Sequence, residues 1–512
     1  MGIKVLFLYP NFRGMNMLPP SIGILSAMLK QNGHTVDLFD TTYYEKLDGA
    51  DSEVDSDRTK TELLMARPYK MPNEITLRTT NVFVDFKKKV ESFSPDLIAM
   101  SATEDMFLLG IKLLREVVHH KILTIAGGVF PTFAPNLALS YREIDVVCKG
   151  EGEDALRLLC ERIERGKTFE NINNLWIKDK NGFITFNPTR MVDMDKNPLI
   201  DMSIFEEARL YRPMGGKVWR MLPVETHRGC PYECAFCNSP SQQVLYKKEE
   251  GKSYLRRKSF ENMRKELLYY KDVVKATALY FWADTFFSWK KGEFEQFCEI
   301  YQDIKLPFWC QTRIETVNYE RLERLQEIGC FRMSFGIEHG NDKFRREVVK
   351  RLVSNEKMIQ NFEIVNEVGI PFSVNNIVGF PYETRELAFN TVQVNRHIDS
   401  TDRNCYAFTP FTGTPLREVC NSLGFLKEED IVHSIYVNGT VLNMPQFPKP
   451  EVDGLLKCFN LYVKFPESRW AEIRQAEPDT PEANALYAKL KDEFVATFWK
   501  ADSNNFEEAS AC

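Results

Sequence analysis

The sequence predicts an α/β protein in which two strand–helix series are followed by a mainly helical segment. Short apolar runs alternate with helical apolar spacing over the first 155 residues, and a second alternation of this kind begins near residue 216. The first series predicts an N-terminal doubly wound, Rossmann-like sheet, because alternating strands and helices form parallel sheets covered on both faces. The second series predicts a partial TIM-type (β/α)6 barrel.

Five apolar runs are the expected strands of the first sheet, at residues 4–9, 34–39, 97–101, 122–126 and 146–148. Between the first two, residues 22–31 show helical apolar spacing that ends at Asn32-Gly33. Ligands of such sheets bind at the carboxyl ends of the strands. The polar, weakly periodic segment 51–72 is expected to be an insertion or a mobile loop.

Four segments follow from these patterns. Residues 1–155 form the first domain, 156–215 a linker, 216–416 the partial barrel and 417–512 a helical segment that caps the barrel. The expected barrel strands lie at residues 222–226, 278–282, 308–312, 332–337, 371–377 and 404–408. Sites in barrels of this type gather at the carboxyl ends of the strands.

Composition excludes several classes of protein. Hydrophobic residues make up 44% of the chain and charged residues 27%, as in ordinary globular proteins. The net charge of -6 gives no electrostatic footprint for nucleic acid, so no nucleic-acid partner is expected. The first apolar run stops at Pro10, which is too short for a signal peptide, and no transmembrane segment is expected. A cytoplasmic protein is predicted.

Three of the 12 cysteines stand within eight residues, at Cys230, Cys234 and Cys237. In a long chain without an export signal, disulfides are a poor explanation for such a group. The spacing places three sulfurs on one loop, directly after an expected strand, and iron–sulfur clusters are held by cysteine thiolates. With three ligands, one iron of a 4Fe–4S cluster stays open to a substrate, which favours a catalytic cluster over an electron-transfer one.

A structural zinc site is the alternative for these cysteines. His227 lies close enough in sequence to be a fourth ligand. Zinc sites are typically built from paired Cys or Cys/His sets that complete four ligands, and the chain has no second cysteine pair. The cluster is therefore the favoured interpretation.

The loop Cys230-Pro-Tyr-Glu-Cys234-Ala-Phe-Cys237, after the first strand of a barrel, resembles that of the radical S-adenosylmethionine (SAM) superfamily. The resemblance implies that the open iron is chelated by SAM, and that one electron cleaves SAM to methionine and a 5′-deoxyadenosyl radical. The other residues that match the family's SAM-binding positions are Phe236, Asp284, Arg313, Ser334, Glu338 and Gly379. Ala283 replaces a second acidic residue that many relatives carry beside Asp284.

The sheet domain that precedes the barrel is similar to the cobalamin-binding domain of one large radical SAM subfamily. The residues that match, and that are expected to contact cobalamin, are Pro20, Ser21, Gly127, Gly128, Thr132, Glu151, Gly152 and Glu153. Thr103 is a further expected contact, because its hydroxyl could bind the corrin amides or the nucleotide tail. A plain nucleotide-binding fold is the alternative, but the three-glycine fingerprint is absent after the first strand. A third interpretation keeps the fold without the cofactor. The chain also lacks the signature of a His lower ligand, so no axial cobalt ligand is assigned.

The resemblance implies a cobalamin-dependent radical SAM methyltransferase that transfers a methyl group from methylcobalamin to an unactivated carbon or phosphorus centre. A radical cyclase, ring-contraction or rearrangement enzyme with the same two domains is the second hypothesis. A cobalamin or redox sensor with a structural cluster is the third. The expected partners are a small-molecule substrate and an electron donor such as flavodoxin or ferredoxin. No catalytic acid or base is assigned from the sequence.

Overall fold

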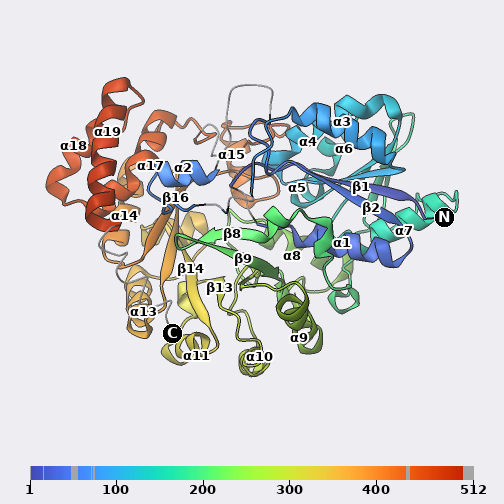
Figure 1. Cartoon of the computed structure of the whole chain (residues 1–512). Coiled ribbons are helices and arrows are strands. Elements are labelled where there is room, and N and C mark those ends of the chain that lie inside the picture. Colours follow the sequence, from blue (N-terminus) through green and yellow to red (C-terminus); the bar gives the residue numbers. More distant parts are fainter. Residues whose placement is uncertain are drawn as a thin grey trace.

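The computed structural model of the chain describes residues 2–14, 17–47, 56–70, 72, 75–433 and 439–499. Two sheets lie side by side in Figure 1, the first at the right and the second at the lower centre, with the C-terminal helices at the left. Each sheet has seven strands. The α/β fold expected from the two strand–helix series is confirmed.

The first sheet has the strand order β2-β1-β3-β4-β5-β6-β7. Its strands are β1 (Lys4–Tyr9), β2 (Thr35–Asp40), β3 (Leu97–Ser101), β4 (Leu123–Gly127), β5 (Val146–Cys148), β6 (Leu175–Lys178) and β7 (Ile184–Phe186). The first five are parallel, and β6 and β7 pair antiparallel. The five predicted strands are therefore confirmed, each to within one residue at either end.

Helices cover both faces of this sheet, which makes it doubly wound. The covering helices are α1 (Pro20–Gln31), α3 (Val82–Phe93), α4 (Glu104–Val117), α5 (Val129–Phe133), α6 (Pro135–Ser140) and α7 (Glu153–Glu164). Along β1, Val5 and Phe7 face a cluster that contains residues of α1 and α7, whereas Leu6 and Leu8 face one that contains residues of α3 and α4. This alternation follows from the two-residue period of a strand.

The segment 156–215, expected to be a linker, contributes to both sheets. It supplies the end of α7, the antiparallel strands β6 and β7, and strand β8 (Tyr211–Met214) of the second sheet. Three short 3-10 helices lie in it, η2 (Met194–Lys196), η3 (Met202–Ile204) and η4 (Glu207–Leu210). Ile200, Met202 and Phe205 belong to the same apolar cluster as α1 and the outer face of the second sheet. One continuous core therefore joins the two halves of the molecule.

The second sheet has the order β16-β15-β14-β13-β12-β9-β8. Its other strands are β9 (Lys217–Val224), β12 (Ala278–Phe281), β13 (Phe308–Thr312), β14 (Cys330–Glu338), β15 (Phe372–Val378) and β16 (Asp402–Ala407). The six predicted strands are parallel, as expected, and the antiparallel edge strand β8 is an addition. The curled sheet stays open between β8 and β16, so it is a half-barrel.

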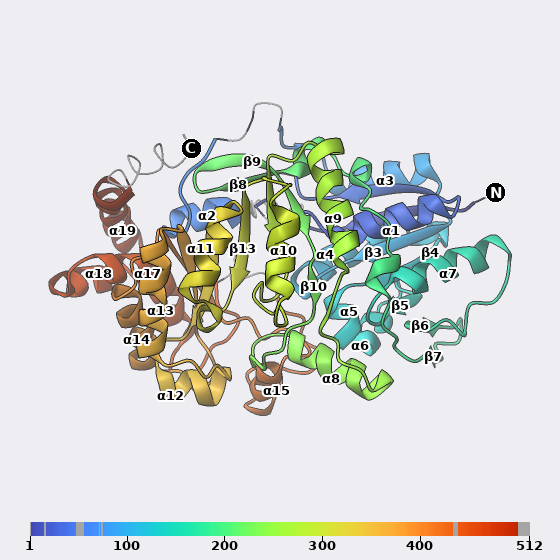
Figure 2. The ribbon, with the colours of Figure 1, turned by 90° about the horizontal axis from the view of Figure 1, so that it is seen from below.

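Helices cover the outer face of the half-barrel, as Figure 2 shows for α9 (Phe260–Leu268), α10 (Glu293–Tyr301) and α11 (Tyr319–Glu327). Helices α13 (Asn355–Val368) and α14 (Arg385–Arg396) follow β14 and β15. Shorter pieces near the carboxyl ends of the strands are β10 (His227–Arg228), α8 (Ser239–Glu250), β11 (Arg256–Arg257), α12 (Asp342–Phe344) and α15 (Pro415–Ser422). Phe281, Phe308 and Phe335 fill the space between strands and helices.

The C-terminal segment covers the β16 edge of the half-barrel. It consists of α17 (Lys449–Lys464), α18 (Trp470–Gln475) and α19 (Pro481–Phe494), and α17 packs against α14 and β16. The segment 51–72 joins this assembly, because α2 (Ser56–Glu62) lies beside it and Leu64 is buried in the same cluster. Residues 51–55 and 71 lie outside the described part of the chain. The expectation of a loop is wrong for α2.

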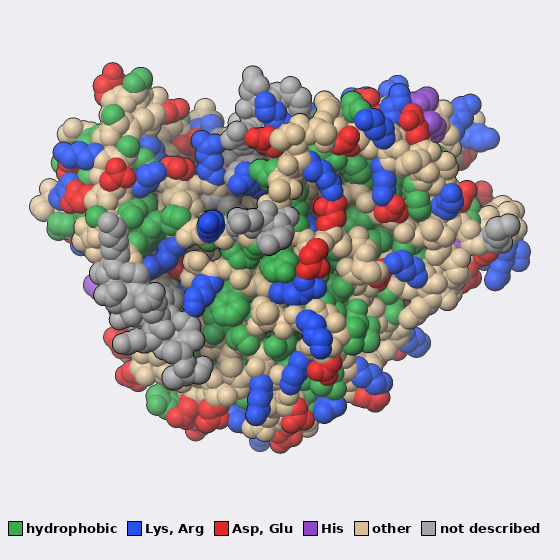
Figure 3. Space-filling model, in the orientation of Figure 1, with side chains coloured by type: hydrophobic (Ala, Val, Ile, Leu, Met, Phe, Trp, Pro, Cys, Tyr) green, Lys and Arg blue, Asp and Glu red, His purple; other side chains and the backbone are tan. Residues whose placement is uncertain are grey.

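Basic and acidic side chains are interspersed on the face shown in Figure 3. Among the described residues, no helix is long and apolar enough to cross a membrane.

Candidate active site

The three cysteines lie on a loop that begins at Gly229, directly after β10. Gly229 has a φ of +90°, which favours glycine at the entrance to the loop. Two flanking segments hold the loop by backbone hydrogen bonds: Ala235 N donates to Val349 O at 3.0 Å, and Leu416 N donates to Ala235 O at 3.0 Å. The loop is therefore fixed between the end of the π-helical turn η7 (Arg345–Val349) and the start of α15.

Each cysteine sulfur has a polar neighbour. Arg313 Nη1 donates to Cys234 Sγ at 3.0 Å, Ser239 N donates to Cys237 Sγ at 3.4 Å, and the Cys230 sulfur lies 3.6 Å from Thr285 Oγ1. Donors of this kind stabilise thiolates, as the sulfurs around an iron–sulfur cluster require.

Burial raises the pKa of all three cysteine thiols, that of Cys237 to about 11. The thiols therefore stay protonated at neutral pH unless a cation replaces the proton, as metal binding does. Half-buried thiols beside N–H donors fit a cluster that is held by three thiolates.

A zinc site finds no support in the surroundings of His227. Its Nδ1 lies 2.9 Å from Thr226 Oγ1, and its ring packs edge-on against Trp289. Burial lowers the pKa of His227 to about 4, so the ring is neutral. In the described part of the chain, no three His, Cys, Asp or Glu side chains converge on one metal ion. In a 4Fe–4S cluster each cysteine binds a different iron, so the sulfurs do not need to converge.

Arg313 and Glu338, two of the predicted SAM contacts, meet in a buried charge cluster beside Cys234. Arg313 Nε donates to Glu315 Oε1 at 2.7 Å, and Arg351 Nη1 donates to Glu338 Oε1 at 2.7 Å. Arg351 Nη2 also lies 3.5 Å from Glu315 Oε2, so the four side chains form one connected group of charges. Glu338 ends β14 with a φ of +66°, a conformation that costs a non-glycine residue about 1–3 kcal/mol and that gathers at functional sites.

Burial sets the ionisation of these groups. It raises the pKa of Glu338, and Arg351 offsets this only in part. Burial also opposes ionisation of Glu315, but Arg351 and Arg313 together lower the pKa of Glu315 below its ordinary value.

Arg351 Nε and Nη2 are buried without a hydrogen-bond partner among the residues described. Buried guanidinium N–H groups suit a carboxylate, and the Glu338 carboxylate suits an ammonium or hydroxyl group. The group of buried charged side chains around Arg351 and Glu338 therefore fits the amino and carboxylate groups of SAM.

Glu315 and Arg351 are the functional candidates that sequence reasoning missed. Neither lies in a recognisable motif, and Arg351 enters the site from the loop after the π-helical turn η7 (Arg345–Val349). The signal in the sequence was Glu315 itself, an acidic residue two positions after the predicted Arg313.

The other predicted SAM contacts lie at the same end of the half-barrel. Ser239 Oγ donates to Asp284 Oδ2 at 2.7 Å, and burial raises the pKa of Asp284. Phe236 packs against Phe380 with ring centroids 6.4 Å apart. Gly379 has a φ of +85°, and a Cβ there would lie 3.1 Å from Val452. This packing explains the glycine without a ligand, and the adenine contact of Gly379 stays a prediction.

Hydroxyl and amide side chains line the face of the sheet opposite the apolar outer cluster. Asn375 Nδ2 donates to Ser334 Oγ at 2.9 Å, and Asn404 Nδ2 donates to Asn375 Oδ1 at 2.8 Å. The row crosses β14, β15 and β16, and Ser334 lies four residues before Glu338. The inner face therefore offers neutral hydrogen-bonding groups next to the predicted SAM site.

The glycine turn after β4 is the part of the first sheet that best fits a flat ligand. Gly128 has a φ of +113°, and a Cβ there would lie 2.5 Å from Ala102 O. At Gly127 the nearest atom to a Cβ would be Cys148 Cβ, 3.7 Å away, so a methyl group fits there in ordinary contact. Thr132 Oγ1 donates to Gly128 O at 2.8 Å and accepts from Gly150 N at 3.0 Å. This backbone surface fits the approach of a macrocycle.

The remaining predicted cobalamin contacts lie in three places. Thr103 is exposed at the start of α4 and donates to Asp105 Oδ1 at 2.6 Å, whereas Pro20 and Ser21 begin α1. Glu151, Gly152 and Glu153 lie at the start of α7. Both carboxylates pair with Arg228, at 2.9 and 2.7 Å, and are buried between the domains. Their predicted contact with cobalamin stays a prediction, and the structure gives them protein partners.

The two glycines after β4 offer a matched test. We expect Gly128→Ala to destabilise the protein by about 1–3 kcal/mol, because its Cβ would collide with the backbone after β3. Gly127→Ala has room, so it should leave the thermal midpoint unchanged and lower only the bound cobalamin. Thermal unfolding and the cobalamin absorbance of the reconstituted protein measure both effects. Full cobalamin loading of a stable Gly127→Ala variant would exclude the predicted contact.

The carboxyl edges of the two sheets face each other. Glu104, next to Thr103, accepts hydrogen bonds from Thr412 N at 2.6 Å and from Thr412 Oγ1 at 3.0 Å. Thr412 lies in the loop after β16, and Asn238 Nδ2, next to Cys237, donates to its carbonyl at 2.9 Å. The cysteine loop and the glycine-bearing edge are therefore brought together by direct contacts.

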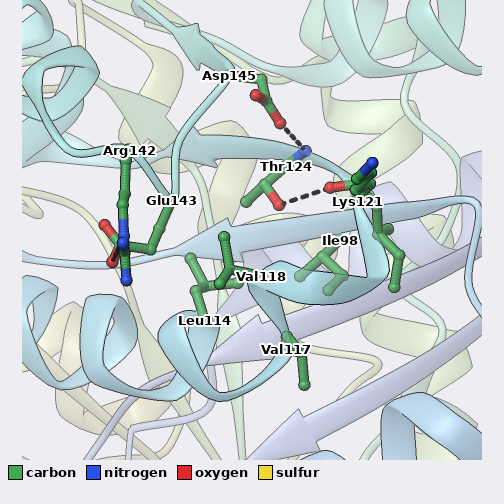
Figure 4. A pocket seen from close by; sticks show the side chains of 10 residues that line it. Ile98, Leu114, Val117, Val118, Lys121, Thr124, Arg142, Glu143 and Asp145 are labelled. Carbon is green, nitrogen blue, oxygen red and sulfur yellow. Dashed lines mark hydrogen bonds and ion pairs between the residues drawn. The ribbon is translucent and has the colours of Figure 1, made fainter.

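A cavity of about 230 Å³ lies at the opposite, amino edge of the first sheet (Figure 4). It is bounded by the end of α4 and the start of β4, and Asp145 Oδ2 there accepts a hydrogen bond from Thr124 N at 2.9 Å. The cysteine loop does not contribute to its lining. The cavity is separate from the candidate active site.

Two family models match the chain. The radical SAM superfamily model matches residues 224–393, and the B12-binding domain model matches residues 74–159. The first range contains the cysteine loop and the predicted SAM contacts, and the second contains β3 to β5 with the glycine turn.

Curated relatives share both halves of the chain. A protein named as an uncharacterized methyltransferase of Pyrococcus horikoshii is 27% identical over 353 residues, covering 67% of this chain and 73% of the relative. The cytidylyl-2-hydroxyethylphosphonate methyltransferase of Streptomyces wedmorensis is 19% identical, covering 83% of this chain and 82% of that protein.

Solved structures share the whole fold. The cobalamin-dependent SAM radical enzyme OxsB, with aqua-cobalamin and SAM bound, is 16% identical with a TM-score of 0.64, covering 96% of this chain and 71% of OxsB. The radical SAM methyltransferase TsrM of Kitasatospora setae, with cobalamin and a 4Fe–4S cluster bound, is 14% identical with a TM-score of 0.63, covering 98% of this chain and 100% of TsrM. Together with the cysteine loop, the two family models show that the chain carries a radical SAM domain and a B12-binding domain. Its cofactors are therefore a 4Fe–4S cluster, SAM and cobalamin.

Proposed function

We propose that the protein is a cobalamin-dependent methyltransferase that methylates an unactivated carbon or phosphorus centre of a small molecule. The observation that carries this proposal is the opposition of the two cofactor edges, with Glu104 and Thr412 joining the edge of the B12-binding domain to the cysteine loop. A substrate bound between the edges can reach both cofactors. The methyltransferase names of the two curated relatives support the same reaction.

When bound, the reduced cluster supplies the electron that splits SAM into methionine and a 5′-deoxyadenosyl radical, and methylcobalamin supplies the methyl group. The chain's own part is orientation. Cys230, Cys234 and Cys237 hold the cluster, and Arg351 and Glu338 would bind the amino acid end of SAM beside it. The Gly127 surface would support the corrin ring. Orientation of this kind lowers the activation free energy substantially, because the reacting atoms must lie about 3–3.5 Å apart.

The inner face of the half-barrel favours a polar, uncharged portion of the substrate. Ser334, Asn375 and Asn404 form a row of hydroxyl and amide groups rather than of charges. Such groups recognise hydroxyl, amide or carbonyl groups of a ligand. We therefore infer a substrate with several neutral hydrogen-bonding groups.

A ring-contraction or other radical rearrangement is the second candidate. The observation that keeps it open is a local match to a relative that is named as a synthase and not as a methyltransferase. This is the 4′-phospho-dehydrooxetanocin synthase of Priestia megaterium, 26% identical over 159 residues, which covers 29% of this chain and 20% of that protein. A sensor with a structural cluster is disfavoured, because the buried charges of Arg351 and Glu338 form a site for SAM that a structural cluster does not need.

Anaerobic reaction of the reconstituted protein with SAM that carries a deuterated methyl group tests the proposal. The candidate substrates are taken from the products of neighbouring genes. We expect 5′-deoxyadenosine and S-adenosylhomocysteine together with a product that gains the deuterated methyl group, as mass spectrometry detects. A rearranged product without added mass, formed with 5′-deoxyadenosine and without S-adenosylhomocysteine, would instead establish the second candidate.

We also propose that the electron comes from a flavodoxin or ferredoxin and that the enzyme works in a reducing cytoplasm. The eleven described cysteines are all free, as in proteins of reducing compartments. A reducing setting also keeps the half-buried cluster intact.

A further inference from the structure

We propose that Glu104 and Glu151 of the B12-binding domain are positioning residues that fix the cobalamin edge to the two ends of the cysteine loop. Each carboxylate lies at the start of a helix that follows a strand of the first sheet, and each is buried against the half-barrel. The inference rests on the proposed function in one respect, namely that a methyl group must cross between the two edges.

Glu104 holds the C-terminal end of the cysteine loop. Its carboxylate is 4% exposed and accepts four hydrogen bonds: from Thr412 N, from Thr412 Oγ1, from Val432 N at 3.1 Å and from Arg417 Nη1 at 3.4 Å. All four donors belong to the region after β16, more than 300 positions away in the chain. Thr412 links Glu104 to the cysteine loop, because its carbonyl accepts a hydrogen bond from the side chain of Asn238, the residue after Cys237.

Glu151 holds the other end of the loop. Its Oε1 pairs with Arg228 Nη1 at 2.9 Å and with Arg256, and its Oε2 accepts from Val192 N at 2.7 Å. Its own backbone N–H donates to the hydroxyl of Tyr246 on α8 at 3.1 Å. Arg228 lies two residues before Cys230 and also pairs with Glu153 and Glu225, at 2.7 and 3.0 Å. The start of α7 is thereby fixed to Arg228 and Arg256, two of the three arginines of the small sheet β10–β11.

These contacts make the relative position of the domains rigid. A buried carboxylate that loses its donors leaves an uncompensated charge, so even a small separation of the domains is unfavourable. Apolar packing alone does not have this property, because it is non-directional. Two such contacts on either side of one loop fix both the distance and the angle between the cluster and the cobalamin edge.

The functional consequence is coupling between the two cofactors. Cleavage of SAM needs only the half-barrel, whereas methylation needs the cobalamin edge at the correct distance. A misplacement of about 1 Å costs on the order of 100-fold in rate. Loss of either contact should therefore leave 5′-deoxyadenosine formation in place while methylated product falls.

Glu104→Gln and Glu151→Gln test the proposal, and Glu266→Gln is the matched control. Because Glu151 is also a predicted cobalamin contact, the variants are compared at equal amounts of bound cobalamin. Glu266 is also buried and also pairs with a cation, Lys258 Nζ at 2.6 Å, but both residues belong to the half-barrel. We expect each test variant to lower the ratio of methylated product to 5′-deoxyadenosine by about tenfold or more. The control should lose comparable thermal stability and keep the ratio of the wild type.

A physical readout separates positioning from a merely structural role. Pulsed dipolar EPR between cob(II)alamin and the reduced cluster should give one narrow distance in the wild type and in Glu266→Gln, and a broadened distribution in both test variants. Thr412→Val, which removes only one hydroxyl donor to Glu104, provides a milder variant in case Glu104→Gln does not fold. It should broaden the distribution in the same sense.

Two outcomes would overturn the inference. One is a test variant with wild-type distance distribution and wild-type product ratio. The other is an equal loss of the ratio in Glu266→Gln, which would show a general effect of buried charge. If the wild type makes no methylated product, the proposed function fails, but hydrogen exchange of residues 227–240 in the cofactor-free protein still decides this inference. Faster exchange in the test variants than in the control supports it, and equal exchange contradicts it.

Discussion

Replacing Cys230, Cys234 or Cys237 by Ala is expected to remove the cluster and with it all cleavage of SAM. Each cysteine binds a different iron, so two remaining thiolates on the same loop cannot hold a cluster with one open corner. Their sulfurs also have donors placed for thiolates, as between Arg313 and Cys234. Iron content should fall to background, and 5′-deoxyadenosine formation from SAM and dithionite should fall by at least about 1000-fold.

Cys160→Ala is the control for this series. Cys160 is buried in α7 of the B12-binding domain and has no place in the cysteine loop. Its substitution removes one buried sulfur atom, so iron content and SAM cleavage should match those of the wild type. A loop variant that keeps its iron and its SAM cleavage would contradict the assignment of the ligands.

Arg351→Ala is expected to lower both the stability of the protein and its affinity for SAM. Arg351 is 3% exposed and faces Glu338 and Glu315, and Glu315 also pairs with Arg313. Removing one partner of a buried ion pair costs about 3–5 kcal/mol, because the other charge stays buried. The midpoint of thermal unfolding should fall accordingly, and SAM affinity, measured anaerobically by calorimetry, should fall with it.

A second substitution separates the two effects of Arg351. In Arg351→Ala with Glu338→Gln, the carboxylate charge that Arg351 compensates is removed, so we expect most of the lost stability to return. SAM affinity should stay low, because neither group is then present to bind it. Recovery of SAM binding in the double variant would show that Arg351 acts only on stability.

The cysteine loop was predictable because its information is local. Three sulfurs within eight residues fall on one loop in any fold that keeps the preceding strand, and the spacing therefore needs no tertiary structure. The strands were predictable for a similar reason. Buried parallel strands are short continuous apolar runs, as at Leu97–Ser101, and their bounds can be read from the chain itself.

Helix α2 in the segment 51–72 and the contribution of 156–215 to both sheets were not predicted, because their partners lie far away in sequence. Helix α2 has a polar sequence. The nearby Leu64 is buried in the apolar cluster of the C-terminal helices, where Asn460 Nδ2 donates to the backbone carbonyls of Leu63 and Leu64. Strands β6 and β7 are short and pair antiparallel with each other, but the pairing of β6 with β5, which extends the first sheet, was not predicted. Local patterns do not contain this information.

The sequence by itself determined the α/β class, the order of the strands along the chain, and the group of three cysteines that is predicted to hold the cluster. Each of these depends on the spacing of residues within one segment. Only the tertiary structure decided that Arg351 joins Glu338 beside Cys234, and that Glu104 and Glu151 bind the half-barrel. The physical reason is that a buried charge is stable only beside partners that compensate it, and those partners come from segments tens to hundreds of residues apart.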